Sequence, residues 1–337
     1  DNEMIRDELL AITLGIWDHM KNGPPGSPPD ADPFKASHWA LEWIGFLPGK
    51  RESLRFIGQH VLTENDVLTS RHFPDAIAYG GWPLDLHPPE GVDAVAEAPC
   101  EQHAVPWLYD IPLRACVSRD ISNLMFAGRN LSATHVAFAS TRVMATCAVV
   151  GQGVGTAAAF AISADVPPHD IAENKELIRR VQQQLLRDDA FLIGVSAEDE
   201  LDLARGAAIT ASSEMPGGEA HLIISGQTRS VHGERGAQPD RSCPGTHRWR
   251  SDPDCGLPAW IELRWQQPVR IRQVQLVFDT GLHRLLTLSH HDGYTSKMHW
   301  SRPQPETISD YEIQTDSGSG WQTEVSATSN YQRLRRH

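Results

Sequence analysis

Two reactive side chains seven residues apart, His135 and Arg142, are the first candidates for chemistry in this chain. Histidine accepts and releases a proton near neutral pH, and the fixed charge of a guanidinium can grip a carboxylate or polarise a carbonyl. The pair could therefore bind a polar substrate and take up its proton. A hydrogen-bonded structural histidine and an arginine that caps a helix would give the same pattern, so both interpretations stay open.

A second set of candidates lies in the stretch GGWPLDLHPP, which carries Trp82, Asp85 and His87 among glycines and prolines. Turn-rich loops of this kind often hold binding and catalytic residues. We predict that Trp82 and Asp85 contact substrate and that His87 joins the catalytic group, although a packed turn would explain the same residues. Arg51 either lines the same pocket or forms a loop ion pair with Glu52.

Alternating glycines at positions 151–155 suggest a place where the backbone approaches a ligand closely. We expect a helix to begin there, because a helix N-terminus favours negative charge. Upstream, the apolar residues 124–127 predict a short buried strand that delivers Gly128 and Arg129 at its carboxyl end, where open α/β sheets bind ligands. The spacing departs from the dinucleotide-binding fingerprint at Thr156, so tight helix packing is the alternative.

The overall charge and the longest apolar segment exclude several classes of partner. A formal net charge of −13 argues against nucleic acid and anionic membranes, which attract clustered Lys and Arg. The segment Val143–Ala164 carries no charge over 22 residues and is long enough to cross a bilayer. Its Ala, Gly, Thr and Ser content is weakly hydrophobic and no aromatic belt flanks it, so we predict a buried helix and no membrane span.

The cysteines and histidines give little support for a metal site. The five cysteines show no C-x-x-C spacing, and only Cys243 and Cys255 suggest a disulfide, with two free thiols as the alternative. A cluster of histidines with one aspartate lacks any H-E-x-x-H motif, and adjacent side chains on a strand point to opposite faces. We therefore predict no metal at His283, His290, His291, Asp292 and His299.

Several elements must position these residues. A chain of 337 residues predicts two or three packing units. Apolar residues recur at helical spacing over 3–21 and 170–186, which predicts two amphipathic helices, the second bridging two domains. Residues 38–95 mix short apolar runs with turn residues and predict short strands. Beyond residue 207, alternating apolar and polar residues predict an antiparallel β module.

The chain contains five ordered motifs: PGKRES, AYGGWPLDLHPPEG, YDIPLR, NLMFAGRNLSATHVAFASTRVMATC and GQGVGTAAAFA. They resemble the carboxyl-terminal half of bacterial FAD-dependent oxidoreductases, some of which are labelled xanthan lyases. The resemblance covers residues 2–165 and implies FAD as the cofactor, in a fold where a dinucleotide-binding domain and a substrate domain interleave. His135 and Arg142 also look like the pair that faces substrate in fumarate-reductase-type flavoproteins. The residues that the resemblance places beside the flavin are Gly128, Arg129, Asn130, Ser132, Gly151, Gln152, Gly153, Gly155 and Thr156.

Both ends of the chain carry further expectations. No strand with G-x-G-x-x-G precedes Asp1, so we expect a fragment that lacks the family's ADP-binding fingerprint. Residues 207–337 resemble a galactose-binding-like β-sandwich of the discoidin type, which we expect to be truncated at its end. Such modules bind carbohydrate or dock against a catalytic domain. The tryptophans that could stack on a sugar, or serve only structure, are Trp249, Trp300 and Trp321.

Together these observations predict an α/β (α+β) flavoprotein fragment followed by an antiparallel β-sandwich. The oxidoreductase part spans 1–165, with a substrate region over 1–100 and a return to the FAD-binding region over 101–165. A helical linker over 166–206 precedes the sandwich at 207–337. The predicted function is hydride transfer between FAD and a small polar substrate such as a sugar or a sugar-derived acid. The alternatives are a xanthan-type polysaccharide lyase and a non-catalytic carbohydrate-binding protein.

Overall fold

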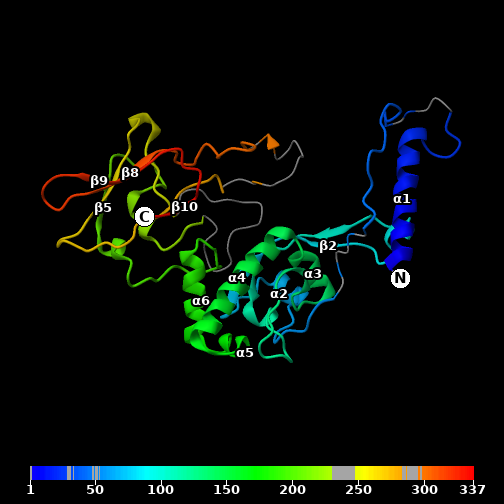
Figure 1. The fold of residues 1–337 in the computed structure, drawn as a ribbon, viewed down its shortest axis with the longest axis horizontal. Coiled ribbons are helices and arrows are strands. Elements are labelled where there is room, and N and C mark those ends of the chain that lie inside the picture. Colours follow the sequence, from blue (N-terminus) through cyan, green and yellow to red (C-terminus); the bar gives the residue numbers. More distant parts are fainter. Residues whose placement is uncertain are drawn as a thin grey trace. The chain divides into compact units, whose positions relative to one another are not determined.

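The computed structural model divides the chain into two compact units, Asp1–Leu54 and Arg55–His337 (Figure 1). The residues that the structure describes are 2–337 without 29–31, 33, 48, 50, 51, 53, 230–246, 283–285, 287–294 and 297.

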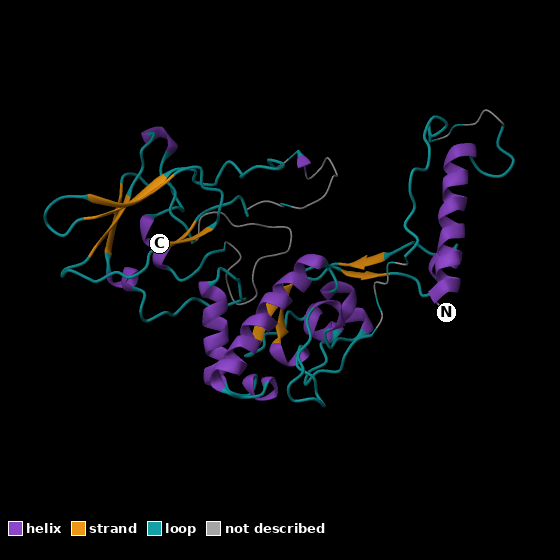
Figure 2. Cartoon of the chain, viewed as in Figure 1, coloured by secondary structure: helices purple, strands orange, loops and turns teal. Residues whose placement is uncertain are grey.

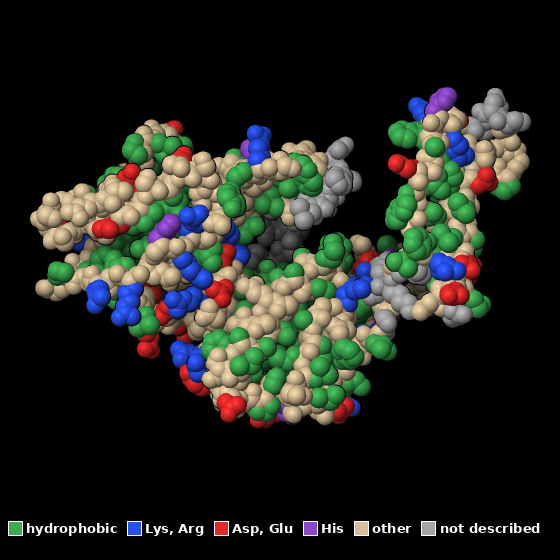
Figure 3. Space-filling view, viewed as in Figure 1, with side chains coloured by type: hydrophobic (Ala, Val, Ile, Leu, Met, Phe, Trp, Pro, Cys, Tyr) green, Lys and Arg blue, Asp and Glu red, His purple; other side chains and the backbone are tan. Residues whose placement is uncertain are grey.

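The first unit consists of one long helix and the segment that returns beside it. Helix α1 (Asn2–Asn22) confirms the helix predicted over 3–21, and it ends where Gly23 adopts a positive φ of 75°. Lys21 holds the returning segment by donating from Nζ to the carbonyls of Ala36, Ser37 and Trp39. No residue of α1 is buried, and apolar side chains gather along it in the space-filling view (Figure 3).

The core of the second unit forms around two antiparallel strands, β1 (Ala76–Gly80) and β4 (Tyr109–Pro112). Helix α4 (Met144–Ala164) packs across β1, and α6 (Lys175–Arg187) packs against both (Figure 2). The burial of Leu177, Ile178, Val181 and Leu185 confirms the predicted apolar stripe of α6. The most deeply buried side chains of this core include Leu62, Val67, Ile77, Tyr109, Ile111, Leu113, Leu131, Val150, Ile171 and Leu185.

The helical segment predicted over 170–186 is divided in two. Helix α5 (Pro168–Ile171) is a single turn, and α6 starts anew after Asn174. The Asn174 side chain accepts hydrogen bonds from the backbone N–H groups of Glu176 and Leu177, which makes it an N-cap. Helix α6 contributes to the same core as α4.

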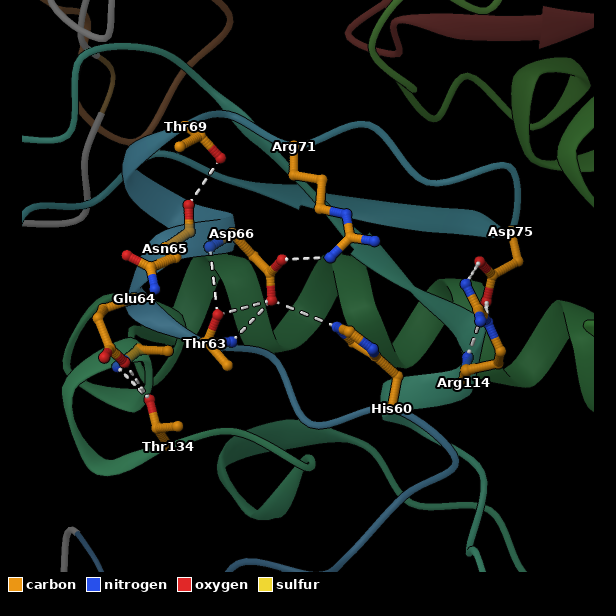
Figure 4. Close-up of polar contacts among 11 residues, drawn as sticks. His60, Thr63, Glu64, Asn65, Asp66, Thr69, Arg71, Asp75, Arg114 and Thr134 are labelled. Atoms are coloured by element: carbon orange, nitrogen blue, oxygen red, sulfur yellow. Dashed lines mark hydrogen bonds and ion pairs between the residues drawn. The ribbon is translucent and has the colours of Figure 1, made fainter.

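A short helix, α2 (Glu64–Leu68), is fixed by the buried carboxylate of Asp66 (Figure 4). Asp66 accepts hydrogen bonds from the backbone and hydroxyl of Thr63 and from Arg71, and His60 Nε2 lies 3.3 Å from Oδ2. Burial alone would raise the pKa of Asp66, but the hydrogen bonds from Thr63, Arg71 and His60 lower it below its ordinary value. The carboxylate therefore closes a capping box and pins the loop that follows.

Helix α2 is connected to the helix that leads into the site. The Thr134 hydroxyl donates to Glu64 Oε2 at 2.9 Å and accepts from Ala137 N, so it caps α3 (His135–Thr141). Strands β2 (Leu84–Leu86) and β3 (Glu101–His103) pair antiparallel, and β2 lies against α3. Helix α3 is thereby held at its first turn by α2 and along its length by β2.

The segment predicted as a buried strand over 124–127 forms only one β-bridge, between Val117 and Met125. Hydrogen bonds from Ser118 N to Leu124 O and from Phe126 N to Cys116 O continue the pairing on either side. The chain then turns into the short helix η3, so the extended segment has no length to become a full strand. The described 3₁₀ turns are η1 (Gly91–Asp93), η2 (Leu113–Ala115), η3 (Gly128–Asn130), η4 (Leu203–Gly206), η5 (Ala220–Ile224) and η6 (Pro253–Cys255).

The prediction that a helix begins at the glycines of positions 151–155 is wrong. Helix α4 begins at Met144, about two turns earlier, so those glycines lie in its interior. Their N–H groups therefore serve the helix rather than a ligand. By length and composition, α4 is the one helix among the described residues that could cross a membrane. Its inner side, with Val150, Val154, Ala157 and Ala161, is buried in the core of the second unit.

The remainder of the second unit consists of antiparallel strand pairs, as the alternation beyond residue 207 predicted. A β-sandwich is not confirmed, because these described pairs remain separate two-stranded sheets. The pairs are β5 (Ala208–Ala211) with β6 (Ile261–Arg264), β7 (Gln275–Val277) with β10 (Leu334–Arg336), and β8 (Tyr311–Thr315) with β9 (Gln322–Ala327).

Candidate functional site

Three of the predicted site residues meet where α3 ends beside β2 (Figure 1). The Arg142 Nη2 group donates to Asp85 Oδ2 at 2.6 Å and to the Asp85 carbonyl at 3.2 Å. His87 Nε2 lies 3.3 Å from Arg142 Nη2 and 3.4 Å from Asp85 Oδ2. Asp85 and Arg142 are each only 13% exposed at the side chain, whereas His87 is 41% exposed. We call these three residues the Arg142–Asp85–His87 cluster.

The surroundings of His87 fix which of its nitrogens carries a proton. His87 Nδ1 lies 2.9 Å from the Pro99 carbonyl oxygen, which can only accept a hydrogen bond. Nδ1 is therefore the N–H donor, and Nε2 of the neutral ring is an acceptor that faces Arg142. If Nε2 gained a proton, it would become a donor, and its favourable interaction would be with the Asp85 carboxylate rather than with Arg142. The ring is thus placed to take up a proton beside a carboxylate that stabilises the resulting positive charge.

The carboxylate of Asp85 is held in its charged form. Partial burial would raise the pKa of Asp85, but the hydrogen bond from Gln102 and the charges of Arg142 and His87 lower it below its ordinary value. At neutral pH the carboxylate balances the guanidinium of Arg142. The cluster therefore carries no net charge while His87 is neutral.

A buried hydrogen-bond relay fixes the start of this loop against α3. The Ser140 hydroxyl donates to the Trp82 carbonyl and accepts from the Tyr109 hydroxyl at 2.6 Å. Ser140 and Tyr109 are both fully buried. The Tyr109 ring crosses Gly80 so closely that any β-carbon there would overlap it. Gly80 thus lets the ring pass, and α3 contacts the loop twice, through Ser140 and through its C-cap Arg142.

The structure does not bring His135 to Arg142. His135 is the first residue of α3 and Arg142 is its C-cap, so they lie about 10 Å apart along the helix axis. His135 is exposed, and the described partners of Arg142 are Asp85 and His87. The spacing of seven residues suggested a pair, but it corresponds to about two helical turns, which place the two residues at opposite ends of α3. His135 therefore stays a prediction without support from its position.

The turn before α3 offers an open approach to the backbone. Gly128 has a φ of +86°, and no atom lies within 4 Å of the position that a β-carbon would take. Arg129 lies close enough to Cys147 of α4 to act on it electrostatically, and η3 packs against α4. Asn130 contributes its carbonyl to the Phe56 N–H, so its backbone serves the fold. Among the described residues, the buried Ser132 hydroxyl has no hydrogen-bond partner.

The N-terminus of α4 follows Arg142 directly and is uncapped. Its N-cap, Val143, provides no side-chain hydrogen bond, and the first turn carries no acidic residue. The first N–H groups of a helix lack partners within it and present a partial positive charge. Met144 at this end is 89% exposed. The first N–H groups of α4 and the open backbone at Gly128 are groups of the kind that bind the phosphates of a nucleotide.

The remaining predicted cofactor residues fall into two environments along α4. Gly153 is buried, and a β-carbon there would lie 2.6 Å from the Ile77 carbonyl oxygen. The packing alternative therefore accounts for Gly153, which faces β1 and not a ligand. Four others line an open groove of about 580 Å³ between α4 and α6, opposite Arg180, Gln184 and Asp188. These four residues are Gly151, Gln152, Gly155 and Thr156.

Several predicted residues lie outside the described residues. They are Arg51, Cys243, His283, His290, His291 and Asp292. Among the residues that the structure does describe, no group of three or more His, Cys, Asp or Glu could hold a metal ion. Trp249 donates its indole N–H to the Ser213 carbonyl, which supports its structural interpretation.

Sequence reasoning missed the residues that support the site. Ser140 and Tyr109 carry no recognisable motif, because serine and tyrosine occur in many packed positions. The adjacent glycines in AYGGW were the available signal, since paired glycines at the end of a strand often mark a close approach. That signal would have indicated a bulky neighbour but not its identity.

The comparison with family models places these observations in a known family. The model for FAD-dependent oxidoreductases matches residues 2–185, which is more than half of the chain and runs from α1 into α6. A search of curated proteins and a search of solved structures each found no match. The family expected from the five motifs is confirmed, whereas xanthan cleavage and a discoidin module are not supported. The chain belongs to the FAD-dependent oxidoreductase family, whose members use FAD as their cofactor.

Proposed function

We propose that this protein transfers a hydride between FAD and a small polar substrate, such as a sugar or a sugar-derived acid, beside the Arg142–Asp85–His87 cluster. The observation that carries the proposal is the convergence of a fixed guanidinium, a charged carboxylate and a partly exposed imidazole. In this family the flavin accepts or supplies the hydride, so the protein must orient the substrate and handle one proton. The cluster has the groups for both tasks.

Different residues support the two sides of the proposed reaction. The uncapped start of α4 and the open backbone at Gly128 would hold the flavin. Arg142 and Asp85 would orient the substrate through hydrogen bonds, and Trp82, 45% exposed, would form one wall. His87 would take up or return the proton at Nε2, while Pro99 keeps the opposite nitrogen protonated. His135 and Arg51 are secondary candidates on sequence grounds alone.

We further propose that residues 207–337 form a galactose-binding-like module that presents carbohydrate to the enzyme. Trp321 supports this idea, because it is 56% exposed at the turn that leads into β9 and offers a flat face for stacking. Isothermal titration of the full chain with oligosaccharides, compared between the wild type and Trp321→Ala, tests the module. Equal heats from both proteins would remove Trp321 from any sugar site.

The main proposal is tested by adding FAD to the purified chain and following the visible spectrum of bound flavin. We expect FAD to bind, and candidate sugars to bleach the bound flavin under anaerobic conditions. Arg142→Lys should slow this bleaching at least tenfold without changing the FAD content, because lysine cannot reproduce the fork geometry of the guanidinium. Glu101→Gln, on the same hairpin but paired with His103, is the matched control. Cleavage of a polyuronate without flavin would instead identify a lyase.

A further inference from the structure

The charge balance of the Arg142–Asp85–His87 cluster restricts the class of substrate. The Arg142 Nη2 group is engaged by Asp85 at 2.6 Å, and both side chains are largely shielded from water. A substrate carboxylate that bound the remaining edge of the guanidinium would lie within one guanidinium width of Asp85. Two carboxylates at that separation repel each other strongly in a partly dry site. The cluster therefore disfavours the binding of an anionic substrate group.

The same groups suit an uncharged hydroxyl group. Neutral His87 Nε2 has one lone pair, which faces Arg142 Nη2 at 3.3 Å. A hydroxyl that replaced this contact could donate to Nε2 or to Asp85 and accept from Arg142. We infer that the substrate group oxidised here is an uncharged alcohol of a polyol or neutral sugar, not a hydroxy acid. The inference rests on the proposed function, and it selects between the two substrate classes that function leaves open.

The chemical step balances with the family's cofactor. Bound FAD would supply the oxidant: the alcohol carbon would become a carbonyl carbon as its hydrogen left with the electron pair for the oxidised flavin. The hydroxyl proton passes to His87 Nε2. The imidazolium then turns its interaction from Arg142 to Asp85, 3.4 Å away, and the proton leaves to solvent through the exposed edge of the ring. A net charge of +1 on the cluster thus exists only while the proton is held.

The first test uses acetate as a probe of Arg142 and needs no flavin, so its result does not depend on the proposed function. The ¹⁵N signals of the arginine side chains are followed during acetate titration, with Arg142 assigned from its loss in Arg142→Lys. In Asp85→Asn, which keeps the side-chain shape and removes its charge, acetate should bind Arg142 at least tenfold more tightly than in the wild type. Equal affinity in the two proteins would overturn the inference.

Two controls separate a local effect from a general one. Glu101→Gln removes a negative charge from the same hairpin, where Glu101 pairs with His103, and should leave acetate affinity unchanged. Arg55→Gln removes the guanidinium that lies over the Phe138 ring, 5.9 Å from the ring centroid. Phe138 is about one helical turn before Arg142, the C-cap of α3. This substitution should leave the gain in Asp85→Asn intact. Loss of that gain would assign the anion to Arg55 and overturn the inference.

The second test compares matched neutral and acidic compounds as reductants of the bound flavin: glycerol with glycerate, and glucose with glucuronate. The neutral member of a pair should reduce the flavin at least tenfold faster in the wild type, and Asp85→Asn should narrow that ratio. Faster reduction by the acids would overturn the substrate class and leave the oxidoreductase function standing. Failure of FAD to bind would count against the proposed function, while the acetate titration still decides the inference.

Discussion

Arg333 Nε donates to Asp189 Oδ2 at 2.6 Å, although the two residues are 144 positions apart in the chain. Arg229 binds the same carboxylate from its other side at 2.7 Å, and Arg336 binds the neighbouring Asp188 at 2.5 Å. Asp189 itself adopts a left-handed φ of 63°, which non-glycine residues rarely do. Asp188 and Asp189, which directly follow α6, therefore connect this helix to Arg229 and to the carboxyl-terminal segment 333–336.

Asp189→Asn should release this junction. The side chain of Asp189 is 10% exposed, so removing its charge leaves two guanidinium groups without their shared partner. We expect a loss of about 3 kcal/mol in the free energy of unfolding, as for other broken buried ion pairs. Urea unfolding measures this loss, and hydrogen exchange should show faster exchange in β7 and β10. The exposed Asp199→Asn is the control, and similar stability of both variants would contradict the role of Asp189.

Acid should weaken the same junction. Burial would raise the pKa of Asp189, but Arg229 and Arg333 lower it below its ordinary value. A carboxyl group whose folded pKa is depressed stabilises the fold above its unfolded pKa of about 4, and this contribution is lost as pH falls through the folded value. The wild type should therefore lose stability below about pH 4 more steeply than Asp189→Asn. Parallel pH profiles of unfolding would rule out this linkage.

Asp110 should show the opposite pH dependence. Burial, with a smaller contribution from the nearby Asp75, raises its pKa to about 6, against the hydrogen bond from Phe73 and the charge of His72. Because the folded state then binds the proton more tightly than the unfolded state, stability should fall as pH rises from about 4 to 6. Carbon-13 titration of the aspartate carboxyl groups checks this value, with Asp110→Asn identifying the signal. A midpoint near 4 would refute it.

The glycines of α4 provide a matched set of substitutions. A β-carbon at Gly153 would lie 2.6 Å from the Ile77 carbonyl, whereas at Gly151 and Gly155 it would meet no atom within 4 Å. Gly151→Ala and Gly155→Ala should each stabilise the helix by up to about 1 kcal/mol, because alanine favours helix. Gly153→Ala should destabilise the protein by about 1–3 kcal/mol through overpacking. Thermal unfolding decides, and equal effects at all three positions would refute this packing.

The relay behind the loop should be sensitive to deletion of one hydroxyl. Ser140→Ala leaves the buried hydroxyl of Tyr109 and the carbonyl of Trp82 without their shared partner, which should cost about 1–3 kcal/mol of stability. Tyr109→Phe removes one hydroxyl and keeps the bond to Trp82, so its cost should be smaller. Fluorine NMR of labelled Trp82 should show motion in Ser140→Ala only. An unchanged Trp82 signal would show that the relay does not hold the loop.

Local patterns predicted some elements because their signals are local. The apolar spacing of α1 and the stripe of α6 identify helices directly, and alternation predicts the strand pairs beyond residue 207. The start of α4 could not be predicted, because Val143 gives it no side-chain cap and its first turns are as apolar as its interior. The glycines further along then suggested a start that the helix does not have.

In the site, the sequence predicted which residue types take part but not which residues contact one another. The sequence identified arginine, aspartate and histidine as candidates, because their chemistry follows from their type. It paired Arg142 with His135, which is near in sequence, whereas the structure pairs it with Asp85, 57 positions away. That contact depends on β2 lying against α3, which no local pattern specifies.

The overlap between Gly80 and Tyr109 constrains how this protein can vary among its relatives. Any side chain at position 80 would occupy the space of the phenol ring, so a change there requires a smaller residue at position 109. The smaller residue would in turn leave Ser140 without its donor. Positions 80, 109 and 140 should therefore change together in an alignment of homologous sequences, as a covarying set that lies next to the site without belonging to it.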